Sequence, residues 1–311
     1  MQPSTIHVVD CNYVSPALAC SYIVEEQGKV AIVENNTSHA VPIILDKVKQ
    51  LGYSLDDVKY AIITHVHLDH AGGSSKLLGA CKNATLLAHP KAAKHIIKPD
   101  VLIASAESVY GKENFQKLYG EISPVPESRV RIMTDGEELE FGERTFHFFY
   151  TKGHANHHFC IYDSKEKTVF TGDTYGISYP FFKTEKPFLF PTTTPTDFDA
   201  EEALLSIEKI HETKASTACL THFGKIEITE FTKNSMKTGI LEMKKLVDSG
   251  ILIPDEKLEE FLRDGIREYF ENKAKEEGVV LTPKAWDFLK MDVELNLMGL
   301  KYAIQKKKKN L

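Results

Sequence analysis

The chain opens with short apolar runs, and their pattern predicts β-strands before any helix. Residues 6–9 are rich in β-branched side chains, and residues 19–24 and 30–33 are apolar runs on either side of a Glu-Gln-Gly turn. Two such runs joined by a glycine-containing turn are typical of a β-hairpin. From residue 43 the apolar positions recur at helical spacing and stop at Gly52, which favours a helix ended by a glycine. The first fifty residues therefore predict strands followed by a helix.

Strand patterns continue as far as residue 221, with helical stretches between them. Residues 91–123 mix lysines with aromatic side chains at irregular helical spacing, which indicates a helical insertion or lid. A helix is expected near residues 199–212, because their apolar side chains share one face. Further strands are expected at 60–64, 84–88, 129–133, 145–151, 159–162, 168–171 and 218–221.

The last part of the chain has a different pattern. After Glu230 no strand pattern is visible, and glycine and proline residues separate long helical stretches. Three helices are expected, near 229–248, 255–277 and 283–305. We therefore expect a domain of strands and helices over residues 1–230 and a C-terminal helical region over residues 231–311.

Composition and charge limit the classes of partner. The chain has 311 residues, of which 42% are hydrophobic and 26% charged, as in ordinary globular proteins. A formal net charge of −6 argues against a nucleic-acid binder, which usually carries a basic face. No apolar run approaches the length that a membrane span needs. These features predict a small-molecule substrate and no nucleic-acid or membrane partner, and a homodimer is compatible with them.

The N-terminus and the cysteines bear on the cellular compartment. The first residues show no basic segment followed by an apolar core, so no signal peptide is expected. The five cysteines are widely spaced and form no Cys-x-x-Cys pair. Reduced thiols in a cytoplasmic protein are therefore the expectation.

The stretch from Thr64 to His70 concentrates potential metal ligands between a predicted strand and a run of small residues. Alternate residues of an extended segment point the same way, so His65, His67 and Asp69 can converge, and His70 can follow as the backbone turns. The alternative is a polar loop with solvated histidines. Three histidines and one aspartate at this spacing rarely serve packing alone, so the stretch predicts a metal-binding loop.

Three more candidates, His154, Asp173 and His222, each fall just after a predicted strand. Residues at strand ends gather at one edge of a β-rich scaffold, where ligands and metals usually bind. Together with the loop they make seven donors. This is more than the four ligands of one tetrahedral ion, but it suits two ions that share a carboxylate. His157 and His158 have a structural role or orient a ligand.

These segments together resemble the metallo-β-lactamase-fold hydrolase superfamily. Residues 65–70 look like its H-x-H-x-D-H signature, and Gly153-His154, Thr171–Thr174 and Thr221–Gly224 match its later motifs in order. The resemblance covers roughly the first 230 residues. It implies an α/β fold, the αββα sandwich, here with a C-terminal helical extension. Within the superfamily, the chain is similar to the glyoxalase II-like relatives and to a bacterial branch with mostly unassigned substrates. No glutathione-binding pattern is visible in it.

The resemblance also implies a ligand set and a cofactor. Two divalent metal ions are expected, with zinc foremost and iron or manganese as alternatives. By the superfamily pattern, the first ion would be held by His65, His67 and His154, the second by Asp69, His70 and His222, with Asp173 bridging them. Glu34 stands where the superfamily usually has an aspartate after its third strand, so either Glu34 takes that place or the role is absent.

Such a centre predicts a dinuclear metal-dependent hydrolase. A hydroxide shared by two ions is a nucleophile at neutral pH, and a small ester, thioester or lactone is the expected substrate. Asp69 is the candidate catalytic residue, because it can position the hydroxide or move a proton. Tyr175, two residues after Asp173, is the candidate substrate-binding residue, although packing of its loop explains it equally well.

Three other functions stay open at this point. One is phosphodiester hydrolysis, whose RNA-processing form the acidic balance disfavours. Another is a flavodiiron-like redox or oxygen-binding protein. Those relatives carry a carboxylate at the position of His67, so the histidine here favours hydrolysis. The last is a sensor that keeps a metal site without turnover.

Overall fold

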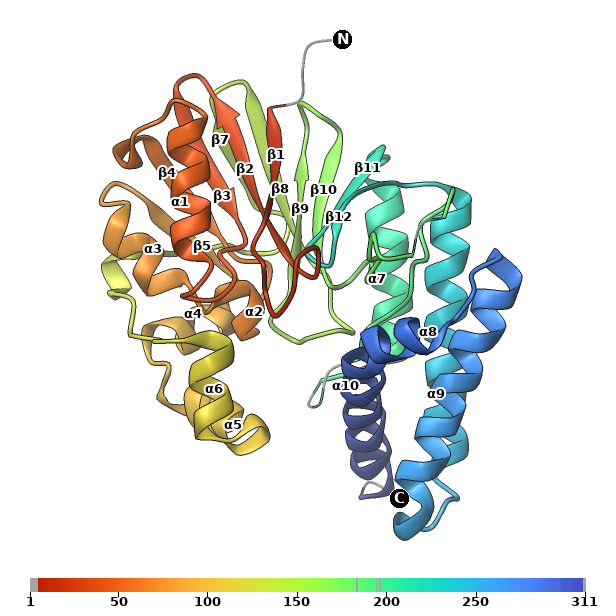
Figure 1. Cartoon of the computed structure of the whole chain (residues 1–311). Helices are drawn as coiled ribbons and strands as arrows, with labels where there is room; N and C mark the ends of the chain where they lie inside the picture. Colours follow the sequence, from red (N-terminus) through yellow and green to blue (C-terminus); the bar gives the residue numbers. More distant parts are fainter. Residues whose placement is uncertain (1–4, 183, 194, 196, 310–311) are drawn as a thin grey trace. The chain divides into compact units, whose positions relative to one another are not determined.

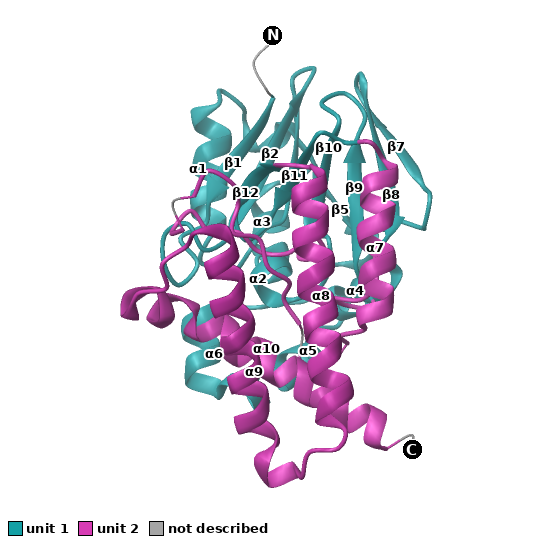
Figure 2. Cartoon of the chain, turned by 90° about the vertical axis from the view of Figure 1, so that its right-hand side faces the viewer, with its two compact units in different colours: residues 1–150, 157–172, 215–226 teal, residues 151–156, 173–214, 227–311 magenta. Residues whose placement is uncertain are grey.

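The chain divides into two compact units, each assembled from separated segments (Figure 2). The structure is a computed structural model that describes residues 5–182, 184–193, 195 and 197–309. Unit 1 comprises residues 1–150, 157–172 and 215–226, and unit 2 comprises residues 151–156, 173–214 and 227–311. The two units are compact parts of the chain and need not fold independently. The expected domain boundary at residue 230 therefore stays a prediction.

Unit 1 contains two six-stranded sheets. In the first sheet β1, β2 and β3 are antiparallel, and β3 to β6 are parallel. Its strands, in spatial order, are β1 (Ile6–Asp10), β2 (Cys20–Glu26), β3 (Lys29–Val33), β4 (Val58–Ile62), β5 (Thr85–Ala88) and β6 (Val130–Ile132). The second sheet has the spatial order β12-β11-β10-β9-β8-β7. Its strands are β7 (Glu138–Phe141), β8 (Arg144–Tyr150), β9 (Phe159–Asp163), β10 (Thr168–Gly172), β11 (Thr217–Leu220) and β12 (Gly224–Glu227).

Both faces of the first sheet are buried. Ala31 and Val33 face the second sheet, in a core that includes Phe146 and Phe148. Ile32 points the other way, into a second core shared with the helices that cover this sheet (Figure 1). Because side chains alternate along a strand, a strand buried on both faces has no polar alternation. This explains the continuous apolar run at residues 30–33.

Six helices of unit 1 are interleaved with the first sheet in the sequence. They are α1 (Val41–Gln50), α2 (Leu68–Ala71), α3 (Ser74–Ala80), α4 (Pro90–Ile97), α5 (Asp100–Tyr110) and α6 (Lys112–Tyr119). Two single-turn 3-10 helices lie at Leu55–Asp57 and Glu127–Arg129. The helical insertion expected at residues 91–123 is confirmed by α4, α5 and α6.

Unit 2 is helical. Its helices are α7 (Ala200–Glu212), α8 (Glu230–Gly250), α9 (Asp255–Glu277) and α10 (Pro283–Lys308). Asp199, Thr229 and Thr282 cap the first turns of α7, α8 and α10 with side-chain oxygens, which satisfies backbone amides that lack a helical partner. The three expected C-terminal helices are therefore confirmed.

Two strands depart from the sequence expectation. β7 and β12 were not expected, because two of the four residues in each are charged and neither forms an apolar run. The α/β class with two sheets and a C-terminal helical region is nevertheless confirmed. All five cysteines are buried and free. Among the described residues, no helix combines the length and the apolar character that a membrane crossing requires.

Candidate metal centre

The loop after β4 places its donors on a tight turn. His65 follows the strand, His67 caps α2, and Asp69 and His70 lie within that single helical turn. The carbonyl oxygen of His70 accepts hydrogen bonds from the backbone N–H groups of Asn35 and Asn36, at 2.9 and 3.1 Å. The side-chain amide of Asn36 donates to the Asp69 carbonyl at 2.7 Å. The segment after β3 therefore holds the backbone of the turn.

The small residues after the turn are required by this close approach. A Cβ atom at Gly73 would lie 2.5 Å from the carbonyl oxygen of Asn35 and 2.7 Å from the Val41 side chain. Both distances are shorter than real Cβ contacts, so a larger residue would separate the two segments. The Gly-Gly pair in the sequence is thus part of the site's construction.

One donor group of unit 1 combines Glu34, His65 and His70. A ligand atom from each lies within 4.8 Å of the others, and all three side chains are fully buried. Glu34 Oε1 is 3.3 Å from His70 Nδ1. The Glu34 carboxylate also accepts hydrogen bonds from the Thr64 hydroxyl and, at 3.5 Å, from the Thr221 hydroxyl. Glu34 therefore has a defined place behind the turn, and its replacement of the superfamily's aspartate stays a prediction.

A second donor group of unit 1 combines Asp69, His70 and His222. His222 follows β11, and its Nε2 lies 3.3 Å from Asp69 Oδ2. His70 Nε2 lies 4.0 Å from the same oxygen. Asp69 keeps 23% of its side-chain surface exposed, whereas His70 is fully buried. This group thus has one carboxylate that remains accessible from outside.

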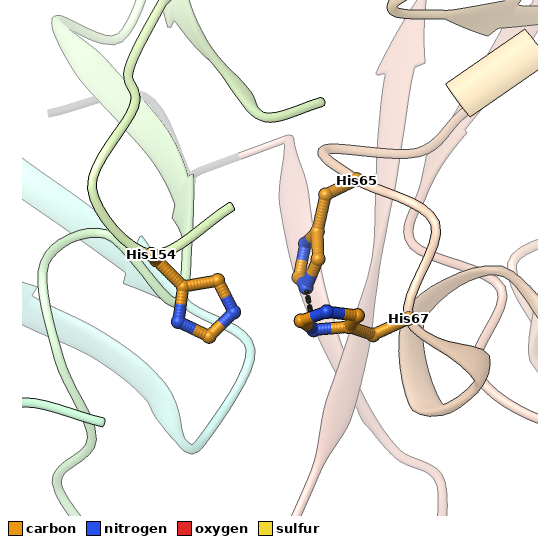
Figure 3. Close-up of side chains that lie close together, drawn as sticks. All are labelled: His65, His67 and His154. Carbon is orange, nitrogen blue, oxygen red and sulfur yellow. Dashed lines mark hydrogen bonds between the residues drawn. The ribbon is translucent and has the colours of Figure 1, made fainter. Parts of the chain in front are cut away.

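The facing rings of His65 and His67 complete the donors of unit 1. His65 Nε2 and His67 Nδ1 are 2.8 Å apart, and the ring planes are nearly perpendicular. Figure 3 shows these two imidazoles joined by the dashed line, and it also labels His154, which belongs to unit 2. Unit 1 therefore brings together five of the seven expected ligands.

Unit 2 brings together the other two. His154 Nε2 lies 3.5 Å from Asp173 Oδ2, and both side chains are buried. The Nδ1 of His154 is 3.3 Å from the carbonyl oxygen of Thr192. Gly153 allows this arrangement, because its φ is +110° and a Cβ there would lie 2.3 Å from the Ala203 nitrogen. The glycine that precedes His154 is thus needed for packing against α7.

Hydrogen bonds orient three of the imidazoles. A carbonyl can only accept, so Nδ1 of His154 donates to Thr192 and Nδ1 of His222 donates to Leu18, at 2.7 Å in the second case. The Thr64 hydroxyl, which donates to Glu34, accepts in turn from Nδ1 of His65 at 3.1 Å. In each ring Nε2 is then the unprotonated nitrogen, as in histidines that bind metals.

These donors fit divalent metal ions. Imidazole nitrogens and carboxylate oxygens are common ligands of zinc, and imidazole also accepts iron. The hydrogen bonds that these imidazoles donate to Thr64, Leu18 and Thr192 are the kind that fix metal-ligating histidines. The site can therefore hold a cation by the residues present, without a further donor.

The two adjoining histidines lie beside the loop. His158 is fully buried, and its ring centroid is 4.9 Å from that of His65. A Cβ at Gly172 would lie 2.5 Å from His158 Nε2 and from the Thr64 hydroxyl, so the glycine makes room for both. His157 Nδ1 accepts from the Val66 amide at 3.4 Å. Both contacts support the position of the turn.

Tyr175 is held inside unit 2. Its side chain is fully buried, and its hydroxyl lies 2.7 Å from His211 Nε2 and 3.1 Å from the Thr232 hydroxyl. Burial raises the pKa of Tyr175 to about 12. These contacts agree with a role of Tyr175 in packing its loop. Contact between Tyr175 and the substrate stays a prediction.

The sequence analysis missed the residues that support the ligands. Thr64, Thr221 and Asn36 each hold Glu34 or the turn, and the analysis assigned none of them a role. A usable signal existed for the two threonines, since each directly precedes a candidate histidine at the end of a strand. Asn36 had no local signal, because its partner Asp69 lies far along the chain.

Comparisons with known proteins give a consistent result. The sequence profile of the Metallo-beta-lactamase superfamily matches residues 19–222. A metallo-beta-lactamase fold-containing protein of Sulfurisphaera tokodaii is 29% identical over 174 residues, which are 55% of this chain and 62% of the relative. An N-acyl homoserine lactonase of Bacillus cereus is 27% identical over 183 residues, 58% of this chain and 61% of the relative. The chain thus matches about three-fifths of the length of these curated relatives.

A solved structure agrees over nearly the whole chain. The crystal structure of an archaeal metallo-beta-lactamase superfamily protein from Sulfolobus tokodaii matches with a TM-score of 0.67. The match covers 96% of this chain and 99% of that chain, at 22% sequence identity. Likeness at this identity shows the fold, so the fold that the sequence resemblance implied is confirmed.

Proposed function

Because the chain belongs to the metallo-beta-lactamase superfamily, we propose that it is a metal-dependent hydrolase of a small ester, thioester or lactone. The observation that carries this proposal is the group of Asp69, His70 and His222, whose nitrogen and oxygen donors lie within 4.8 Å of one another. The similarity to an N-acyl homoserine lactonase supports the lactone among the three substrate classes.

The proposed ligand set takes five residues from unit 1 and two from unit 2. It assigns His65, His67 and His154 to a first divalent ion, Asp69, His70 and His222 to a second, and Asp173 to both. Zinc is the proposed metal, with iron or manganese as alternatives. Bound divalent ions would supply Lewis acidity and a water whose pKa is lowered to about 7.

The side chains of the protein supply positioning and proton movement. Asp69 is proposed to position the attacking water and to accept its proton at a carboxylate oxygen, because its side chain is 23% exposed. His222 faces that carboxylate at 3.3 Å and keeps it oriented. Glu34 accepts from the Thr64 hydroxyl and through it fixes the ring of His65, whose Nε2 faces Nδ1 of His67 at 2.8 Å. Flavodiiron-like relatives carry a carboxylate at the position of His67, so a histidine there supports hydrolysis over redox chemistry.

Metal analysis and a substrate panel test the proposal. Protein expressed with added metal should contain about two ions per chain, and one ion or none would contradict the dinuclear assignment. The panel should include esters, thioesters, lactones and phosphodiesters, beside an oxygen-reduction assay. Turnover of phosphodiesters alone, or oxygen reduction alone, would replace the proposed activity with one of the alternatives.

A pair of variants ties the activity to the site. His67→Ala should abolish hydrolysis and leave the fold intact, as judged by circular dichroism. The matched control His95→Ala removes a half-buried imidazole of α4 and should keep full activity. Retained turnover in His67→Ala would remove this site from the reaction. The cytoplasmic location, the absence of nucleic-acid and membrane partners, and a homodimer stay predictions.

A further inference from the structure

Unit 2 contains a cavity of about 730 Å³ between two of its helices, α8 and α9 (magenta in Figure 2). Its lining lies between Phe231 and Ser249 of α8 and between Phe261 and Glu277 of α9, so the cavity belongs to this unit alone. The two expected metal ligands of unit 2, His154 and Asp173, line a different hollow. The cavity, which we call the helical cavity, is therefore built from residues other than the metal donors.

Two glycines shape the walls of the helical cavity. A Cβ atom at Gly239 of α8 would lie 2.7 Å from the hydroxyl oxygen of Tyr269, and one at Gly265 of α9 would lie 2.3 Å from the Leu246 side chain. Glycine in the middle of a helix is unfavourable relative to alanine, so a close approach is needed at both positions. Gly239 thus leaves space in front of the Tyr269 hydroxyl.

The hydroxyl of Tyr269 has no explanation in packing. Tyr269 lines the cavity, and its side chain is 8% exposed. The hydroxyl is buried, and no described residue forms a hydrogen bond with it. A buried hydroxyl without a partner is unfavourable, whereas the adjacent Phe270 is buried without a polar atom. The hydroxyl therefore indicates a ligand that supplies its partner.

Both lysines that line the cavity have carboxylate partners. Lys273 is 7% exposed, and its Nζ donates to the Ser235 hydroxyl and to the Glu277 carboxylate, at 2.6 Å in each case. Lys245 Nζ lies 3.5 Å from the Glu242 carboxylate. The positive charges of the lining are therefore balanced within the protein.

Three further carboxylates line the cavity on the side of α9, those of Asp264, Glu268 and Glu276. Within the part of the chain that the structure describes, none of them forms an ion pair with a lysine or arginine. Asp264 and Glu268 are one helical repeat apart, about 6 Å along the axis, and like charges at this spacing repel each other. A bound cation would remove this repulsion.

The arrangement favours an extended organic cation over a single metal ion. Burial is the main cause that raises the pKa of Tyr269. The negative charges of Glu277, Glu242 and Glu276 raise it further, so the hydroxyl lies in a negative potential. Among the described residues, the groups whose donor atoms lie within 4.8 Å of one another include no carboxylate of this cavity. These carboxylates are therefore too widely spaced to surround one ion.

We propose that the helical cavity binds an aliphatic diamine or polyamine. One ammonium group donates to the phenol oxygen of Tyr269, and another lies beside the carboxylates of Asp264 and Glu268. The methylene chain contacts Leu246 and Phe261, which add apolar surface to the lining. Because these residues are not metal donors, the proposal is independent of the hydrolase function.

Calorimetric titration of the metal-loaded full chain with 1,4-diaminobutane tests the proposal. The diamine should bind saturably, and 1,4-butanediol, which has the same carbon chain without the charges, should not. Tyr269→Phe should weaken the binding about fivefold, the effect of one lost hydrogen bond. Glu268→Gln should weaken it about two- to fivefold, as expected for an exposed ionic contact.

Two control variants separate the helical cavity from the rest of the surface. Glu271→Gln removes an exposed charge of the same helix outside the lining, and Tyr302→Phe alters a 40% exposed tyrosine of α10. Both should leave the affinity for the diamine unchanged. Equal losses in Glu268→Gln and Glu271→Gln would overturn the proposal, because they indicate general attraction to an acidic surface.

Three other results would also contradict the proposal. They are no saturable binding of the diamine, equal binding of the diamine and the diol, and unchanged affinity in Tyr269→Phe. The last result would place the diamine elsewhere, for example on the bound metal. Circular dichroism of Tyr269→Phe should match the wild type, since the substitution removes a hydroxyl that has no partner in the described chain.

Discussion

Unit 1 contains two buried polar clusters that are completed in different ways. In the first, the buried Arg144 guanidinium pairs with Asp163, with Glu26 at 2.9 Å and with Glu166 at 3.3 Å. In the second, the carboxylates pair with imidazoles, Glu34 with His70 and Asp69 with His222. Both clusters bring together residues that lie far apart in the sequence.

The difference lies in the source of positive charge. A buried carboxylate is unfavourable unless a cation or hydrogen bonds compensate it. Arginine is always charged, and Lys165 adds a second cation at 2.8 Å from Glu26, so side chains of the protein supply the positive charge of the first cluster. Imidazole acts in metal sites as a neutral ligand, so the cluster around His70 suits an added cation. A cluster of buried carboxylates therefore marks a functional site when the protein itself supplies no arginine or lysine to balance their charge.

Removing the arginine should produce the largest effect on stability. Arg144→Met leaves the buried Asp163 carboxylate without its cation and should lower the free energy of unfolding by about 3–5 kcal/mol. Urea titration measures this change. The control Arg131→Met removes a 45% exposed partner of Glu137 and should cost under about 1 kcal/mol. Metal content should not change in either variant, and a loss of metal in Arg144→Met would break the comparison.

Glu34→Gln should affect the second cluster through the metal. The amide keeps the size of the side chain but weakens its hold on Thr64, so metal affinity should fall by about 10- to 100-fold. Isothermal titration of the metal-free protein measures this. Glu138→Gln, at a 62% exposed position, is the control and should leave the affinity unchanged. If Glu34→Gln lowers stability with no change in affinity, the second cluster is structural like the first.

Tyr175→Phe extends the comparison to unit 2. The hydroxyl has internal partners in His211 and Thr232, so its loss should lower the free energy of unfolding by about 1 kcal/mol. The kcat/KM of the best substrate should remain unchanged. Parallel denaturation and kinetic measurements separate the two roles. A raised KM at unchanged stability would instead establish the predicted contact with substrate.

The smallest effect is expected at an exposed ion pair. Hydrogen bonds from Lys233 and Lys237 lower the pKa of Glu208 from 4.5 to about 2. A lowered pKa gives stability above pH 4.5 that is lost as pH falls towards 2. Because the Glu208 side chain is 39% exposed, Glu208→Gln should cost under about 1 kcal/mol at pH 7. The difference between wild type and variant should shrink in urea titrations below pH 4.5, and a constant difference would contradict this cause.

Local patterns made much of the fold and the ligand loop predictable. The run before His65, the His-x-His-x-Asp-His spacing and the strand-end positions of His154 and His222 are all visible within a few residues. The helix expected at 255–277 has the same bounds as α9, because glycine and proline residues mark both ends. Helices and ligand loops of this kind depend on neighbours in the sequence, so pattern alone identifies them.

Features that depend on distant pairing were not predictable. The parallel register of Val33 with Ile62 brings Glu34 beside Thr64, and no local pattern contains that register. Three tyrosines from three segments of unit 1 meet ring against ring, and their approach depends on the path of the insertion. β7 and β12 are short and take their conformation from their neighbours in the second sheet.

The place of β11 in the second sheet has a consequence for the order of folding. β11 pairs in parallel with β10, with Val169 opposite Ala218, and delivers His222 to Asp69. During synthesis the loop from His65 to His70 leaves the ribosome long before His222. Asp69 and His70 therefore lack their contact with His222 until that residue has emerged. Such non-local pairings form slowly, and chains fold from the N-terminus as they emerge. The donor group of Asp69, His70 and His222 is therefore completed late in folding, after most of unit 1 has been made.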